Sequence, residues 1–62
     1  MIVYEVVQKY FDNGATKANL NPIESDTLPE SSYEERKGYD IYKDYFSDIN
    51  AARNFYQQAL NA

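Results

Sequence analysis

A turn signal close to the N-terminus follows a stretch that favours extended backbone. Residues 2–11 are rich in β-branched and aromatic types, which suit a pleated, half-buried surface. The turn signal is Asp12-Asn13-Gly14. Asn-Gly between two apolar stretches is the strongest short-range indication of a hairpin, because a type I′ turn needs positive φ at both central residues. The sequence therefore predicts a β-hairpin with strands at about 2–11 and 15–22.

A two-residue turn at 13–14 would fix which residues of the two strands lie opposite one another. It predicts Lys9 opposite Ala18 and Val7 opposite Leu20. Pro22 cannot donate a ladder hydrogen bond, so the second strand ends there or lies at a sheet edge. Both predicted faces are mixed, and neither is clearly the core. One carries Val3, Val7, Phe11, Ala18 and Leu20 with Glu5 and Lys9, and the other carries Ile2, Tyr4, Val6, Gln8 and Tyr10 with Lys17, Asn19 and Asn21.

The middle segment, residues 24–38, breaks the alternating pattern. It is polar, it contains Pro29 and Gly38, and its few apolar residues follow no period. A loop of this length in so small a domain is usually either functional or disordered. We therefore expect a mobile polar loop, in which Ser31 or Ser32 could cap a short helical turn.

Residues 39–46 fit either a strand or a helix. As a helix, their apolar side chains form a stripe at helical spacing, and as a strand, successive side chains face opposite sides. The enrichment in aromatic residues favours the strand. The Ser47-Asp48 pair just after it is typical of a strand that ends where a capped helix begins.

The C-terminal segment has the pattern of an amphipathic helix at about 48–61. Asp48 suits the positive end of the helix dipole. The whole chain, 1–62, is therefore predicted as a single small α+β domain, in which a β-hairpin and a third strand form an antiparallel sheet packed against one C-terminal helix. The apolar face of that helix carries Ile49, Ala52, Phe55, Tyr56, Ala59 and Leu60.

Several short motifs form a pattern that spans the chain outside residues 24–38. They are Tyr4-Glu5-Val6-Val7, Lys9-Tyr10-Phe11-Asp12-Asn13-Gly14, Tyr39-Asp40-Ile41-Tyr42, Asp44-Tyr45-Phe46, and Ala52 with Phe55. The pattern resembles a group of short uncharacterised proteins from bacteria and their prophages. In that group an aromatic strand ending in Phe-Asp or Phe-Ser leads into an Ala-rich helix. The resemblance implies a strand at 39–46 and a phage-linked origin, and it brings no activity with it.

Length and cysteine content limit how the chain can be stabilised. It has 62 residues and no cysteine, so a disulfide and a thiolate zinc site are both excluded. A domain this short buries only about 60% of the surface that its unfolded chain exposes, so we expect marginal stability. Self-association through a sheet edge or an exposed face would relieve the shortage of core.

Composition also bears on location and on partners. The absence of cysteine fits a reducing compartment, and the sequence has neither a signal peptide nor a membrane-spanning apolar run, which predicts a cytoplasmic protein without a membrane partner. Ten acidic residues against six basic ones give a net charge of −4. Phosphate backbones are bound by clustered Lys and Arg. The basic residues here are scattered along the sequence apart from Arg36-Lys37, so no direct nucleic-acid binding is expected.

The residues that most enzymes depend on are missing. The chain has no histidine and no cysteine, which removes the commonest general base, the commonest metal ligand and the most nucleophilic side chain. On a strand, Asp40 and Asp44 would lie about 13 Å apart, beyond the ~5–9.5 Å of glycosidase carboxylate pairs. We expect no catalytic residue, no metal site and no cofactor.

Tyrosine is the most unusual component. Seven tyrosines and three phenylalanines are more rings than one helix face and one sheet face can bury fully. Some serve as core aromatics in a chain without tryptophan, and others should be exposed, because tyrosine is enriched at interfaces. We expect Tyr39, Tyr42 and Tyr45 to be divided between the two sheet faces. The candidate binding residues are Tyr33, Tyr39, Tyr42, Tyr45, Asp40 and Asp44.

Two functions are compatible with these features. The first is a small acidic, non-enzymatic module that binds or regulates another protein through exposed tyrosine. The alternative is an acidic inhibitor that mimics nucleic acid and occupies the basic groove of a DNA- or RNA-binding enzyme. Arg36-Lys37 interrupt the run of acids that such mimicry would use, which comprises Glu24, Asp26, Glu30, Glu34 and Glu35 followed by Asp40, Asp44 and Asp48.

Overall fold

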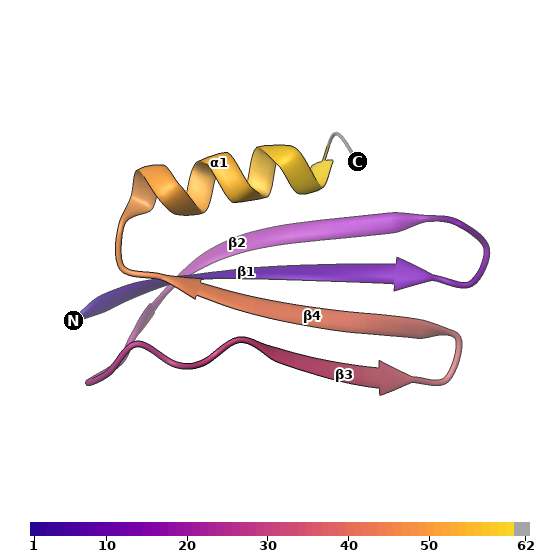
Figure 1. Ribbon diagram of the computed structural model, residues 1–62, viewed down its shortest axis with the longest axis horizontal. Coiled ribbons are helices and arrows are strands. Elements are labelled where there is room, and N and C mark those ends of the chain that lie inside the picture. The colour runs from indigo at the N-terminus through magenta and orange to yellow at the C-terminus, as the bar shows by residue number, and fades with distance from the viewer. Residues whose placement is uncertain (61–62) are drawn as a thin grey trace.

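The computed structural model describes residues 1–60 and contains a four-stranded antiparallel sheet with one helix (Figure 1). In the sheet the strand order is β2-β1-β4-β3, so the N-terminal strand is one of the two central strands. The predicted fold class, an antiparallel sheet packed against a C-terminal helix, is confirmed. The elements are β1 (Ile2–Phe11), β2 (Thr16–Glu24), β3 (Ser32–Arg36), β4 (Tyr39–Phe46) and α1 (Ile49–Leu60).

The hairpin between β1 and β2 has a three-residue loop where a two-residue turn was predicted. The Phe11 N–H donates to the Ala15 carbonyl at 2.8 Å, and the Gly14 N–H donates to the Phe11 carbonyl at 2.9 Å. Gly14 has a φ of +90°, but Asn13 does not have a positive φ, so the turn is not type I′. The loop instead follows the three-residue pattern, in which a left-handed residue follows a type I turn.

The additional loop residue shifts the pairing of β1 and β2 by one position. Lys17, not Ala18, lies opposite Lys9, and Leu20 does not lie opposite Val7. Because strand side chains alternate with a period of two, this shift moves every β2 side chain to the other face relative to β1. The predicted register and the predicted composition of the two faces are therefore wrong. The hairpin itself is confirmed, and β2 is an edge strand, which tolerates the proline within it.

The middle segment is not one long loop. Its second half forms β3, which pairs with β4. All five residues of β3 are exposed, so the strand shows no apolar alternation that the sequence could reveal. Gly38, with a φ of +90°, lies in the turn between β3 and β4. The predicted helical turn capped by Ser31 or Ser32 is wrong, because Ser32 begins the strand and the Ser31 hydroxyl donates to Asp44 Oδ1 at 2.6 Å.

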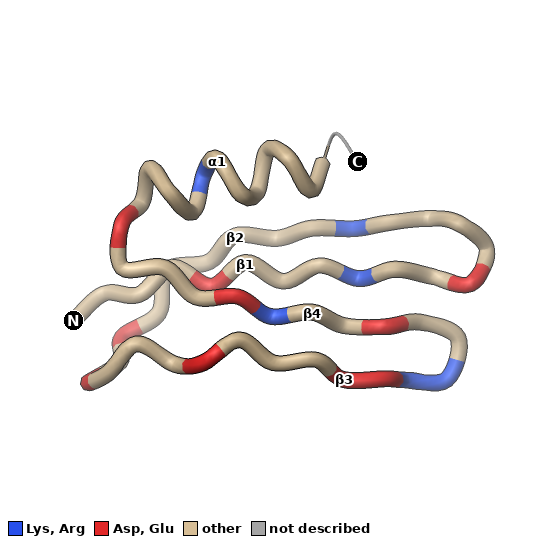
Figure 2. The backbone as a smooth tube through the Cα atoms, viewed as in Figure 1, with Lys and Arg blue, Asp and Glu red and all other residues tan. Residues whose placement is uncertain are grey.

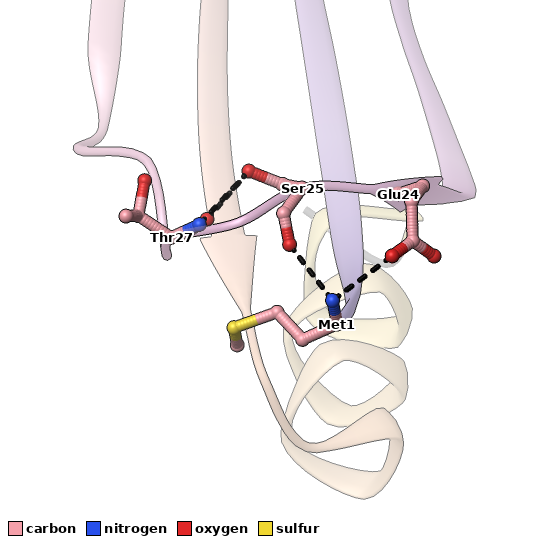
Figure 3. Close-up of polar contacts among 4 residues, drawn as sticks. All are labelled: Met1, Glu24, Ser25 and Thr27. Atoms are coloured by element: carbon pink, nitrogen blue, oxygen red, sulfur yellow. Dashed lines mark hydrogen bonds and ion pairs between the residues drawn. The ribbon is translucent and has the colours of Figure 1, made fainter.

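The connection from β2 to β3 has to pass the ends of both central strands, because β2 and β3 are the two edges of the sheet (Figure 1). Hydrogen bonds and an ion pair tie the beginning of this connection to the start of the chain (Figure 3). The N-terminal ammonium of Met1 donates to Glu24 Oε1 at 3.0 Å and to the Ser25 carbonyl at 2.9 Å. The Ser25 N–H returns a bond to the Met1 carbonyl at 2.9 Å, and the Ser25 hydroxyl donates to the Thr27 carbonyl. These bonds continue the β1–β2 ladder into the connection.

The predicted strand at 39–46 and the predicted helix cap are both confirmed. The Asp48 side chain accepts a hydrogen bond from the Asn50 N–H at 3.1 Å, and the Asp48 carbonyl accepts from the Ala52 N–H at 3.1 Å. One otherwise unpaired donor of the first helical turn is thereby satisfied. The helix was expected to reach residue 61, which lies outside the described residues.

Helix α1 covers one face of the sheet. The Phe55 ring of α1 packs against Phe46 of β4 with ring centroids 5.3 Å apart, and the fully buried Val6 points to the same side as Phe46. We call this side the helix face and the opposite side the open face. On β1 and β4, the helix face carries Ile2, Tyr4, Val6, Gln8, Tyr10, Asp40, Tyr42, Asp44 and Phe46, and the open face carries Val3, Glu5, Val7, Lys9, Phe11, Tyr39, Ile41, Lys43 and Tyr45.

The core is small. Among the described residues, the buried apolar side chains are Val3, Val6, Ile41 and Ala52. Val6 and Ala52 belong to the helix face and to α1, whereas Val3 and Ile41 point to the open face. The packing of α1 therefore depends heavily on half-buried aromatic rings.

Candidate functional site

Three tyrosine rings lie on the part of the helix face that α1 leaves uncovered. Helix α1 packs over β2, β1 and the end of β4 and does not contact β3. The ring centroids of Tyr10 and Tyr42 are 5.5 Å apart, with the rings nearly perpendicular, and those of Tyr33 and Tyr42 are 4.8 Å apart. The rings come from β1, β4 and β3 and form a row across the sheet. Tyr33 is 54% exposed and Tyr42 is 39% exposed.

Carboxylates lie among these rings. Asp40, Asp44 and Glu35 point to the same side as Tyr42, since Glu35 pairs directly with Asp40 in the β3–β4 ladder. The Tyr33 hydroxyl donates to Asp40 Oδ1 at 3.2 Å. Among the described residues, neither of the two ion pairs involves these carboxylates. We call the set the acidic tyrosine patch, and it consists of Tyr10, Tyr33, Tyr42, Glu35, Asp40 and Asp44.

The patch contains a hollow of about 290 Å³ lined by Gln8, Tyr10, Asp40 and Tyr42. The Tyr10 hydroxyl donates to Gln8 Oε1 at 3.4 Å. Partial loss of water, together with the neighbouring charge of Asp40, raises the pKa of Tyr33 above 10.0, so its hydroxyl stays a hydrogen-bond donor. Two aromatic rings and a carboxylate line this hollow. Such a lining suits a cationic group, because a guanidinium or ammonium is attracted both to an aromatic ring and to a carboxylate.

The predicted site residues are divided between the two faces. The fold brings together Tyr33, Tyr42, Asp40 and Asp44, whereas Tyr39 and Tyr45 lie on the open face. The expected division of the β4 tyrosines between the faces is confirmed. On the open face, the Tyr39 ring packs against Phe11 with centroids 5.3 Å apart, and the Tyr45 hydroxyl donates to Glu5 Oε2 at 2.9 Å.

Three residues at this site were not among the predicted ones: Tyr10 and Glu35 of the patch, and Gln8, which lines the hollow. Gln8 and Tyr10 reach the patch only because β1 pairs with β4, a pairing between segments about 30 residues or more apart. The sequence shows that Gln8 and Tyr10 lie on one face of β1, because they are two residues apart. It does not show which residues of other strands lie beside them. Glu35 belongs to a strand that the sequence does not reveal.

The hydrogen bond from Tyr45 to Glu5 makes folding stability sensitive to alkaline pH. Burial and this bond raise the pKa of Tyr45 above its ordinary 10.0. The folded chain therefore keeps the proton at pH values where the unfolded chain loses it, and this contribution to stability is present below pH 10 and is lost as the pH rises above it. We expect Tyr45→Phe to lose less stability than the unmodified protein between about pH 8 and about pH 11. Urea midpoints at both pH values measure the difference, and parallel losses in the two proteins would contradict it.

Two further properties of the described residues bear on function. Within residues 1–60, no group of three or more acidic side chains is arranged to hold a metal ion. Over the same residues, α1 lacks the length and the apolar character that a membrane-spanning helix needs. Comparison with protein-family models, with curated proteins and with solved structures gave no match.

Proposed function

We propose that this protein is a small, non-enzymatic binding module that docks another protein onto the acidic tyrosine patch. The supporting observation is a row of three tyrosines in which Tyr42 packs against both of the others, and two of the three are exposed. The carboxylates beside them have no cation within ion-pair distance among the described residues. Tyrosine supplies contact area with few rotatable bonds, so little entropy is lost when a partner covers it. A phage-linked, cytoplasmic regulator of a host or phage protein fits this role.

The chemistry of the patch favours a partner segment that carries arginine or lysine. The strand residues of the helix face include four acidic side chains and no basic one, namely Glu24, Glu35, Asp40 and Asp44. A basic side chain in the hollow between Tyr10, Tyr42 and Asp40 would meet aromatic rings and a carboxylate together. Charge complementarity of this kind sets the rate of association and the choice of partner.

Mimicry of nucleic acid by the acidic middle segment is less well supported. Such mimicry needs a continuous row of free acids, but Glu34 points to the open face and pairs with Arg36 at 2.9 Å. Glu24 pairs with the N-terminal ammonium at 3.0 Å at the far end of β2. The acids therefore spread over two faces and do not form one strip.

Titration with a short peptide of alternating arginine and glycine, followed by NMR of the labelled protein, tests the proposal. The expected result is a set of amide shift changes confined to β3, β4 and the Gln8–Tyr10 end of β1. A peptide with glutamine at every arginine position should cause much smaller changes. Asp40→Asn together with Asp44→Asn should weaken binding about tenfold, since two charge pairs at a partly exposed surface contribute roughly 1–2 kcal/mol in total.

A matched control is Glu30→Gln with Asp26→Asn, which removes two charges from the exposed β2–β3 connection outside the patch. This variant should bind the arginine peptide nearly as well as the unmodified protein. Equal losses in the two double variants would mean that net charge, and not the patch, attracts the peptide. Shift changes centred on the open face would overturn the proposed site.

A further inference from the structure

Three lysines gather on the open face of an acidic protein. Lys9 of β1 lies directly opposite Lys17 of β2, and Lys43 of β4 lies diagonal to Lys9 (Figure 2). Directly opposite side chains have Cβ atoms about 4.5–5.5 Å apart and diagonal ones about 7–8 Å apart. Like charges placed opposite one another destabilise a sheet, and no acidic side chain pairs with these lysines within ion-pair distance among the described residues.

Aromatic rings adjoin the lysines on the same face. Phe11 and Tyr39 pack with centroids 5.3 Å apart, and Lys17 Nζ lies 5.9 Å from the centre of the Phe11 ring. These rings and the Lys9 side chain are half-buried and Lys17 is exposed. Helix α1 lies on the opposite side of the sheet, so it does not cover this surface.

The charges of the two faces are segregated. The strand residues of the open face include four basic side chains, Lys9, Lys17, Arg36 and Lys43, against two acidic ones, Glu5 and Glu34. On the helix face, by contrast, all of the charged strand residues are acidic. The net charge of −4 therefore conceals a face with a positive surplus.

We infer that the open face binds single-stranded nucleic acid, with the lysines contacting phosphates and the Phe11–Tyr39 pair stacking against bases. A groove or face that combines positive charge with aromatic rings is the arrangement by which sheet proteins hold single strands without reading their sequence. The expectation of no direct nucleic-acid binding came from basic residues that are scattered in sequence, and the fold brings three of them together. The binding is weak, because few phosphates are contacted, and it weakens further as the salt concentration rises.

Fluorescence anisotropy with labelled oligo(dT) and oligo(U) tests this inference. Three phosphate contacts on a single strand predict a slope of log affinity against log salt of about −2. Lys17→Gln with Lys43→Gln should weaken binding about tenfold and reduce the slope to about −0.7. Tyr39→Leu should weaken binding at least about fivefold through lost base stacking. Circular dichroism should show that the lysine variant folds, since it relieves the repulsion between Lys9 and Lys17.

Lys37→Gln with Arg53→Gln is the matched control, since it also removes two positive charges. One is in the β3–β4 turn and the other is on the exposed side of α1. This variant should bind the oligonucleotides as the unmodified protein does. Three results would overturn the inference: no binding at about 50 mM salt, equal weakening in the control, or equally tight binding of heparin, which has no bases. Equal heparin binding would identify the face as a general polyanion site.

Discussion

Replacing Phe55 with alanine is expected to lower the free energy of unfolding by about 2–3 kcal/mol. The Phe55 ring packs against Phe46 at 5.3 Å and connects α1 to the sheet, and both rings are half-buried, so the loss is smaller than that for a fully buried phenylalanine. A domain of this length is stabilised by about 3–9 kcal/mol in total. The substitution therefore removes a large share of the stability.

Urea unfolding followed by circular dichroism measures this loss. Gln57→Ala is the matched control, because Gln57 is exposed on the same helix and alanine has the highest helix propensity. The control should be as stable as the unmodified protein or slightly more stable. If the two variants unfolded at the same urea concentration, α1 would not be held to the sheet by the contact described here.

Replacing Gly14 with valine is expected to cost about 2 kcal/mol, because a β-branched residue adopts the left-handed region only with strain. Gly14 has a φ of +90°, and no atom outside its chain neighbours lies within 4 Å of the position that a Cβ would occupy. The cost is therefore conformational and not steric. It should appear as a lower thermal midpoint, with the chain still able to form the same sheet.

Gly14→Asn tests whether the cost comes from the left-handed φ at this position or from a general loss of loop flexibility when glycine is replaced. Asparagine tolerates the left-handed region far better than valine, so this variant should lose less than half as much stability. Equal losses for valine and asparagine would mean that the loop requires glycine for a reason other than its φ.

The same loop shows where local sequence signals stop being sufficient. Asn13-Gly14 correctly predicts a hairpin, because a position needing positive φ lies between two stretches of high β propensity. The dipeptide does not determine whether the loop has two or three residues. That single residue decides whether Lys17 faces the same side as Lys9. With the two-residue turn, the lysine cluster is divided between the faces, so it could not be recognised before the register was known.

Other features followed from local chemistry alone. Ser47-Asp48 after an aromatic stretch marks the end of a strand and the start of a capped helix, and alternation along β4 separates Tyr42 from its neighbouring tyrosines. The acidic tyrosine patch was only partly predictable, because its members come from three strands. Pairing of β1 with β4 joins distant segments, and β3 has no apolar periodicity to reveal it.

Strand β3 forms one wall of the acidic tyrosine patch but has little to hold it in place. It pairs only with β4, all five of its residues are exposed, and α1 does not contact it. Segments with so few buried contacts open at a much smaller free-energy cost than global unfolding. Backbone amides of β3 should therefore exchange with deuterium long before those of β1, which is paired along both sides. A partner that covers Tyr33 would slow exchange in β3 while leaving the slowest amides of β1 unchanged, so occupancy of the patch can be read from the protein's least protected strand.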